Sequence, residues 1–172
     1  MSEFKYPSIH DFPPFFTKQP TETTWNDQKR LWSGLILDYC RHHRLHTLRL
    51  SEALKTPLFS NSSIQLLEII DFMVTNGDAE WTGKKKDKSS CIIYWRKPGE
   101  WADLIYQWVQ DHGFVNTVMT AYELANGEDT ADQEFHGIER DVLQKAIDIL
   151  VSRGKAQVIQ SASSDDFGVK FF

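Results

Sequence analysis

The most informative pattern in the sequence occurs twice, as LLEIIDFMVTNGDA at residues 66–79 and as LQKAIDILVSRGKA at residues 143–156. The residues matched in register include Ile70 with Ile147, Asp71 with Asp148, Val74 with Val151, Gly77 with Gly154, and Ala79 with Ala156. Both glycines stand where an apolar helical stripe stops, and a left-handed helix cap favours glycine. The repeat therefore predicts an internal duplication.

Around the first copy, the sequence predicts a helix, a short strand, two further helices and a β-hairpin. The evidence is apolar residues at helical spacing, a short alternating stretch, and two apolar segments around a basic tip. These elements are expected at about residues 25–43, 45–50, 51–57, 62–76 and 78–95. This order is typical of a winged-helix domain.

The second half repeats the order after Pro98. Its helix, strand, short helix, long helix and hairpin are expected at about residues 98–113, 118–120, 122–126, 143–154 and 155–172. The predicted fold class is α+β, mainly α, with tandem winged-helix domains at residues 25–97 and 98–172 and an extended tail at residues 1–24.

Composition and motifs exclude several classes of function. The net charge of -5 disfavours tight, sequence-independent nucleic-acid binding, and no apolar run is long enough to span a bilayer. The chain has no P-loop, GxSxG, HExxH or CxxC motif, so we expect neither an enzyme nor a cofactor or metal site. Cys40 and Cys91 are expected to be reduced thiols in a cytosolic protein.

A nucleic-acid-binding winged helix is the alternative interpretation. Its third helix should present basic or amide side chains to DNA, yet residues 62–76 contain no Lys or Arg. The hairpin tip is basic and could touch phosphates or acidic lipid heads weakly, although a solvated charge run is the simpler interpretation. The basic residues of this tip are Lys84, Lys85, Lys86 and Lys88.

The tail carries the clearest functional signal. Four of the six prolines lie within residues 1–20, and Pro13-Pro14-Phe15-Phe16 predicts a stiff extended segment that displays two rings. Such a segment loses little entropy when it docks in an aromatic groove. Alternatively, the tail folds back over the first domain's own helix. A third possibility, a ligand for a WW domain, is weakened because Phe16 stands where PPxY has tyrosine.

A second candidate surface is acidic. Its carboxylates are Glu123, Glu128, Asp129, Asp132 and Glu134. They lack the spacing of an EF-hand, and no nucleophile accompanies them. A solvated acidic loop and a docking surface for a basic partner helix both remain open.

Several motifs along the whole chain resemble the small Vps25-type subunit of the ESCRT-II endosomal sorting complex. They are Phe12-Pro-Pro-Phe-Phe-Thr17, Pro57-Leu-Phe59, Glu100-Trp101, Leu104-Ile-Tyr-Gln-Trp-Val109, Tyr122-Glu-Leu124, Asn126-Gly-Glu-Asp-Thr130, Glu134-Phe-His-Gly137 and Gly168-Val-Lys-Phe-Phe172.

The resemblance implies an adaptor, recruited from the cytosol to the endosome membrane, that works in multivesicular-body sorting of ubiquitinated cargo. It implies that the proline and aromatic motifs dock on the two larger ESCRT-II subunits, which maps to Phe12–Phe16 with Tyr6-Pro7 as a second contact. It also implies that residues 98–172 recruit the filament-initiating ESCRT-III subunit. The acidic residues are expected to serve that contact on electrostatic grounds alone.

Overall fold

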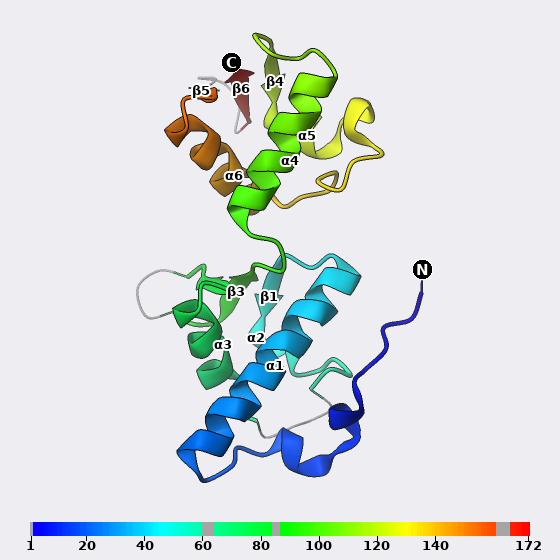
Figure 1. The fold of residues 1–172 in the computed structure, drawn as a ribbon, viewed down its shortest axis with the longest axis vertical. Helices are drawn as coiled ribbons and strands as arrows, with labels where there is room; N and C mark the ends of the chain where they lie inside the picture. Colours follow the sequence, from blue (N-terminus) through cyan, green and yellow to red (C-terminus); the bar gives the residue numbers. More distant parts are fainter. Residues whose placement is uncertain (1, 60–63, 84–86, 161–165) are drawn as a thin grey trace. The chain divides into compact units, whose positions relative to one another are not determined.

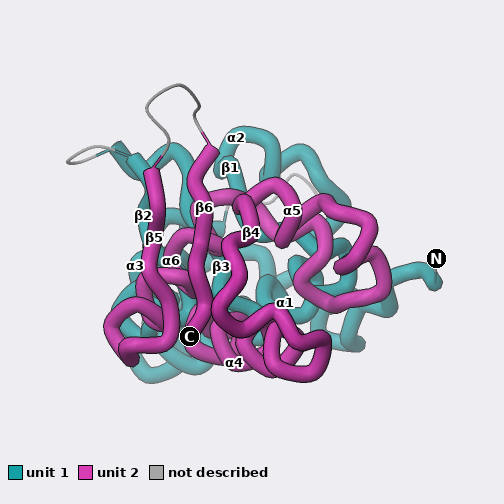
Figure 2. The backbone as a smooth tube through the Cα atoms, turned by 90° about the horizontal axis from the view of Figure 1, so that it is seen from above, with its two compact units in different colours: residues 1–95 teal, residues 96–172 magenta. Residues whose placement is uncertain are grey.

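The chain forms two compact units in a computed structural model, residues 1–95 and residues 96–172 (Figure 2). The structure describes residues 2–59, 64–83, 87–160 and 166–172.

Unit 1 consists of a long helix, two further helices and a three-stranded sheet, preceded by two short 3-10 helices (Figure 1). The elements are η1 (Ser8–Asp11), η2 (Pro13–Phe16), α1 (Glu22–His43), β1 (Thr47–Arg49), α2 (Leu50–Ala53), α3 (Leu66–Thr75), β2 (Ala79–Trp81) and β3 (Ser90–Ile93). The antiparallel sheet has the order β1-β3-β2, with Leu48 opposite Cys91 and Ala79 opposite Ile93.

Unit 2 repeats this arrangement. Its elements are α4 (Pro98–Asp111), β4 (Val118–Thr120), α5 (Ala121–Asn126), η3 (Glu128–Thr130), α6 (Arg140–Ser152), β5 (Ala156–Gln160) and β6 (Phe167–Phe171). The sheet order β4-β6-β5 matches that of unit 1. The predicted tandem winged-helix fold is confirmed.

The repeated sequence pattern forms the same helix end in both units. Gly77 and Gly154 have φ angles of 77° and 73°, the left-handed region in which a side chain is strained. The amide of the following residue then bonds back across the last turn, from Asp78 to the Met73 oxygen at 2.8 Å and from Lys155 to the Leu150 oxygen at 2.9 Å. Both glycines thus direct the chain from the helix into the strand that follows.

Some helix boundaries differ from the prediction. The short helix α2 runs from Leu50 to Ala53, so it begins one residue earlier and ends sooner than the predicted range 51–57. Helix α3 begins at Leu66, after Gln65 at its N-cap, whereas the predicted start at residue 62 lies outside the described residues.

The tail is folded against the rest of unit 1. Residues 8–11 and 13–16 form η1 and η2, and Phe15 is only 3% exposed within the core that α1 and α3 share. The expectation of an extended segment without a core is therefore wrong, and the alternative, a tail folded back over α1, is what the structure has. The physical reason is that proline's fixed φ also suits a 3-10 turn, and packing on α1 removes the rings from water.

Candidate docking surfaces

Phe15 anchors the tail to α1. Its ring stacks on Trp32 with centroids 4.2 Å apart, and Trp32 stacks in turn on Phe59 at 5.3 Å. The Phe15 carbonyl oxygen accepts hydrogen bonds from the Trp32 Nε1 at 2.9 Å and from the Gln28 Nε2 at 2.8 Å. Both the ring and the backbone of Phe15 are therefore fixed by one face of α1.

Gln28 is a buried polar residue that holds the tail in place. The side chain is 5% exposed, and its Nε2 also donates to the Thr17 oxygen at 2.9 Å, while its Oε1 accepts from the Gln19 amide at 3.2 Å. Sequence reasoning missed this residue. The available signal was its position, since Gln28 lies between Trp25 and Trp32 on the apolar face of the helix.

An ion pair attaches the end of the tail to α3. The Lys18 Nζ lies 2.9 Å from both Glu68 carboxylate oxygens, and the Trp25 Nε1 donates to the same carboxylate at 3.0 Å. These hydrogen bonds, that from Lys18 foremost, lower the pKa of Glu68 below its usual range although partial burial opposes them. The side chains of Lys18 and Glu68 are 41% and 43% exposed, so water screens the ion pair and its contribution to stability is small.

The start of the tail is held through His10. Its ring stacks on Tyr6 with centroids 4.2 Å apart, its Nε2 lies 2.9 Å from the Leu58 oxygen, and Phe16 contacts it edge-on at 5.1 Å. Tyr6 and Phe16 are consequently half-buried. Burial is also the main reason that the pKa of Tyr6 is raised.

The outer side of the tail presents an apolar groove. Phe12 is 54% exposed and faces solvent beside Leu31 of α1, which is 53% exposed. Both residues line a groove of about 430 Å³ together with Ile9 and Pro14 of the tail. Large apolar side chains that stay in water on a fixed backbone are typical of a docking surface.

The seven tail residues that the sequence predicts as docking residues therefore differ in their exposure. Four are exposed, namely Pro7, Phe12, Pro13 and Pro14; Tyr6 and Phe16 are half-buried; and Phe15 is buried. Because Phe15 is 3% exposed and part of the unit's own core, its ring is not displayed at the surface, contrary to the expectation that both rings of the Pro-Pro-Phe-Phe motif are displayed.

The acidic residues of unit 2 lie on an ordered segment. Thr130 is fully buried, and its Oγ1 donates to the Gly127 oxygen at 3.2 Å and lies 3.1 Å from the His136 Nδ1. Phe135 is 1% exposed and packs edge-on against Trp108. The chain between α5 and α6 is therefore held by its own core contacts.

All five predicted carboxylates are exposed on this segment. They are Glu123 on α5, Glu128 and Asp129 on η3, and Asp132 and Glu134 in the turn that follows. Glu134 pairs with Arg96, whose guanidinium also lies over the Trp101 ring at 4.9 Å. A fixed acidic surface thus lies on unit 2, with one of its members paired within the chain.

The cations expected at a nucleic-acid interface are paired or missing in the described residues. Helix α3 contains no Lys or Arg, and in the corresponding region of unit 2 Arg140 pairs with Asp166 and Arg153 with Asp103. On the wing of unit 1, Lys88 pairs with Asp71 at 2.8 Å. The other three lysines of the predicted basic tip, Lys84, Lys85 and Lys86, lie outside the described residues.

The two cysteines are buried in unit 1. Burial raises the pKa of both the Cys40 and the Cys91 thiol to about 12, so both are protonated at neutral pH and poor nucleophiles. Across the described ranges, His, Cys, Asp and Glu form no group of three or more that could hold a metal ion. No helix in those ranges combines the length and the apolar character needed to cross a membrane.

Two winged-helix units, a folded proline and aromatic segment and an exposed apolar groove define the class of protein: a tandem winged-helix protein with surfaces suited to protein partners. A family model described as "ESCRT-II complex subunit" matches residues 9–139. The chain belongs to this family.

Relatives and solved structures agree with that assignment. Proteins named "Vacuolar protein-sorting-associated protein 25" are 44% identical in Danio rerio and 42% identical in Homo sapiens, covering 98% of this chain and 99% and 98% of those proteins. The crystal structure of subunit VPS25 of the endosomal trafficking complex ESCRT-II matches with a TM-score of 0.85 and 25% identity over 96% of this chain and 98% of that one. A chain from the endosomal complex ESCRT-II (VPS22/VPS25/VPS36) matches with a TM-score of 0.80 and 26% identity over the same shares.

Proposed function

We propose that this chain is a non-catalytic adaptor subunit of ESCRT-II, recruited from the cytosol to the endosome membrane, whose unit 1 docks on the two larger subunits. The family and the complex named for the similar structure support this assignment. The main evidence for the position of the docking site is the pair Phe12 and Leu31, because each is more than half exposed and both line one groove.

The fold of the tail explains why such a site would bind well. Phe15, Gln28 and Lys18 fix the tail before any partner arrives, so little conformational entropy remains to be lost on docking. Apolar anchors at the centre of an interface contribute most of its binding energy. Phe12 and Leu31 are therefore the proposed anchors, supported by the exposed Pro7, Pro13 and Pro14 and the half-buried Tyr6 and Phe16.

For the C-terminal unit, we propose recruitment of the filament-initiating ESCRT-III subunit through its acidic surface. The support is the exposure of Glu123, Glu128, Asp129, Asp132 and Glu134 on an ordered segment, which suits a basic partner helix. A variant in which Glu128, Asp129 and Asp132 are all changed to Lys tests this assignment. If it bound the ESCRT-III subunit as tightly as the unchanged chain does, the assignment would be overturned.

The Phe12→Ala/Leu31→Ala double variant tests the docking site. We expect at least a tenfold loss of affinity for the pair of larger subunits, because truncating a central anchor costs about 2 kcal/mol. The measurement is co-purification followed by titration of the reconstituted complex, with folding checked by circular dichroism.

The matched control is Leu54→Ala/Leu67→Ala. These leucines are 37% and 44% exposed on unit 1 and do not line the groove, so assembly should be unchanged. If both double variants assembled like the unchanged chain, the groove would not be the docking site.

A further inference from the structure

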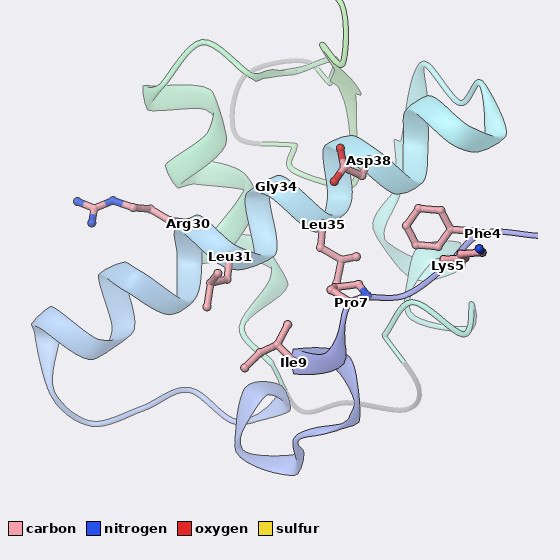
Figure 3. A pocket seen from close by; sticks show the side chains of 9 residues that line it. All are labelled: Phe4, Lys5, Pro7, Ile9, Arg30, Leu31, Gly34, Leu35 and Asp38. Atoms are coloured by element: carbon pink, nitrogen blue, oxygen red, sulfur yellow. The ribbon is translucent and has the colours of Figure 1, made fainter.

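A second groove of about 380 Å³ lies on the other side of Leu31 (Figure 3). Leu31 and Leu35 point from α1 toward Ile9 and Pro7 of the tail, which form the facing wall. This groove shares Ile9 and Leu31 with the first groove, so the two form one apolar surface along α1.

Gly34 lies on α1 in the wall of the second groove, and its own chain gives no reason for a glycine there. It is exposed in the helix interior, has no positive φ, and a Cβ added to it would meet no heavy atom within 4 Å beyond its chain neighbours and the nearby backbone of its own helix. At Gly127, by contrast, a Cβ would clash with the Glu123 backbone oxygen, so the fold itself excludes a side chain there. Glycine in a helix interior costs about 1 kcal/mol relative to alanine, so Gly34 carries a cost without an internal benefit.

The charges at the rim of the second groove are mixed. Lys5 and Asp38 both line it, and neither makes an ion pair among the described residues, whereas Arg30 pairs with Asp27. An anionic lipid surface or a nucleic acid would be repelled by Asp38 and attracted by Lys5. A peptide that carries both signs of charge complements this rim.

We propose that the groove at Gly34 receives a backbone segment of one of the larger ESCRT-II subunits, which approaches α1 more closely than any side chain at residue 34 would allow. The segment places an apolar side chain on Leu31, with an acidic residue near Lys5 and a basic residue near Asp38. This inference rests on the proposed function and extends the docking surface from the tail to the middle of α1.

The Gly34→Ala and Gly34→Gln variants test the inference. Both residues form helices better than glycine, so we expect an unchanged or higher midpoint of thermal unfolding. Affinity for the larger subunits, measured by titration, should fall at least tenfold for Gly34→Gln and less for Gly34→Ala. A change that stabilises the fold and weakens assembly distinguishes a contact site from a structural position.

The control is Thr23→Gln, which adds the same side chain to an exposed position of α1 outside both grooves and should leave assembly unchanged. If Gly34→Gln assembled normally while Phe12→Ala/Leu31→Ala did not, the inference would be overturned and the proposed function would stand. Normal assembly of both variants would overturn both proposals. Sedimentation of the chain by itself measures its self-association. If Gly34→Gln lost self-association but still bound the larger subunits normally, the groove would belong to a second copy of this chain and the inference would be overturned.

Discussion

Replacing Phe15 with alanine should lower the free energy of unfolding of unit 1 by about 3 kcal/mol or more, the range measured for Phe→Ala in protein cores. The side chain is 3% exposed and stacks on Trp32, so its removal leaves a cavity against the largest ring of the core. Urea unfolding followed by tryptophan fluorescence measures the change, because Trp32 reports on the same contact.

Phe12→Ala is the matched control for that experiment. It removes the same side chain three residues away, but from a position that is 54% exposed, so we expect less than about 1 kcal/mol of change. Equal effects of the two substitutions on stability would show that the tail does not adopt the fold described here.

The second large effect is expected for Gln28→Glu. The buried amide donates to the oxygens of Phe15 and Thr17, and a carboxylate at the same place would face both oxygens without a proton to donate. An uncompensated buried charge costs about 3–5 kcal/mol, so unit 1 should lose that much stability at neutral pH. Chemical unfolding at neutral pH measures the loss.

Gln28→Met separates the effect of charge from the loss of hydrogen bonds. The Phe15 oxygen keeps its bond from Trp32 and the Thr17 oxygen keeps one from Gln19, so the apolar substitute should cost only about 1–2 kcal/mol. A variant with methionine as unstable as the variant with glutamate would mean that the lost hydrogen bonds, and not the buried charge, account for the instability.

The duplicated fold was predictable from the sequence because its signals are local. Periodic apolar residues define each helix, and Gly77 and Gly154 mark helix ends whose left-handed backbone requires glycine. Strand β4 was predicted at the residues it occupies, Val118–Thr120. The elements around the repeat follow from the same short-range patterns.

The fold of the tail was not predictable in the same way, because its determinants are distant in sequence. Phe12, Phe15 and Phe16 look alike in a segment without periodicity, and what buries Phe15 is its contact with Gln28 and Trp32 on α1. Only the position of Gln28 within an apolar helix face hinted at such a partner.

The order of the acidic segment was likewise hidden from sequence reasoning. It depends on the buried hydroxyl of Thr130 between Gly127 and His136, and on Phe135 inserted beside Trp108. Five nearby carboxylates favour a solvated loop by composition alone. The contacts that fix the loop become visible only in three dimensions.

Hydrogen exchange of the chain alone and in complex with the two larger subunits tests most directly the claim that a folded tail and α1 form the docking surface. We expect the amides of Phe12, Phe15 and Thr17, which are hydrogen-bonded within the tail, to be protected in the free chain. Assembly should then slow exchange further in residues 4–17 and 27–38 and leave residues 98–172 unchanged. A tail that exchanges like an unfolded chain, or protection that appears only in residues 98–172, would show that the folded tail and α1 do not form the docking surface.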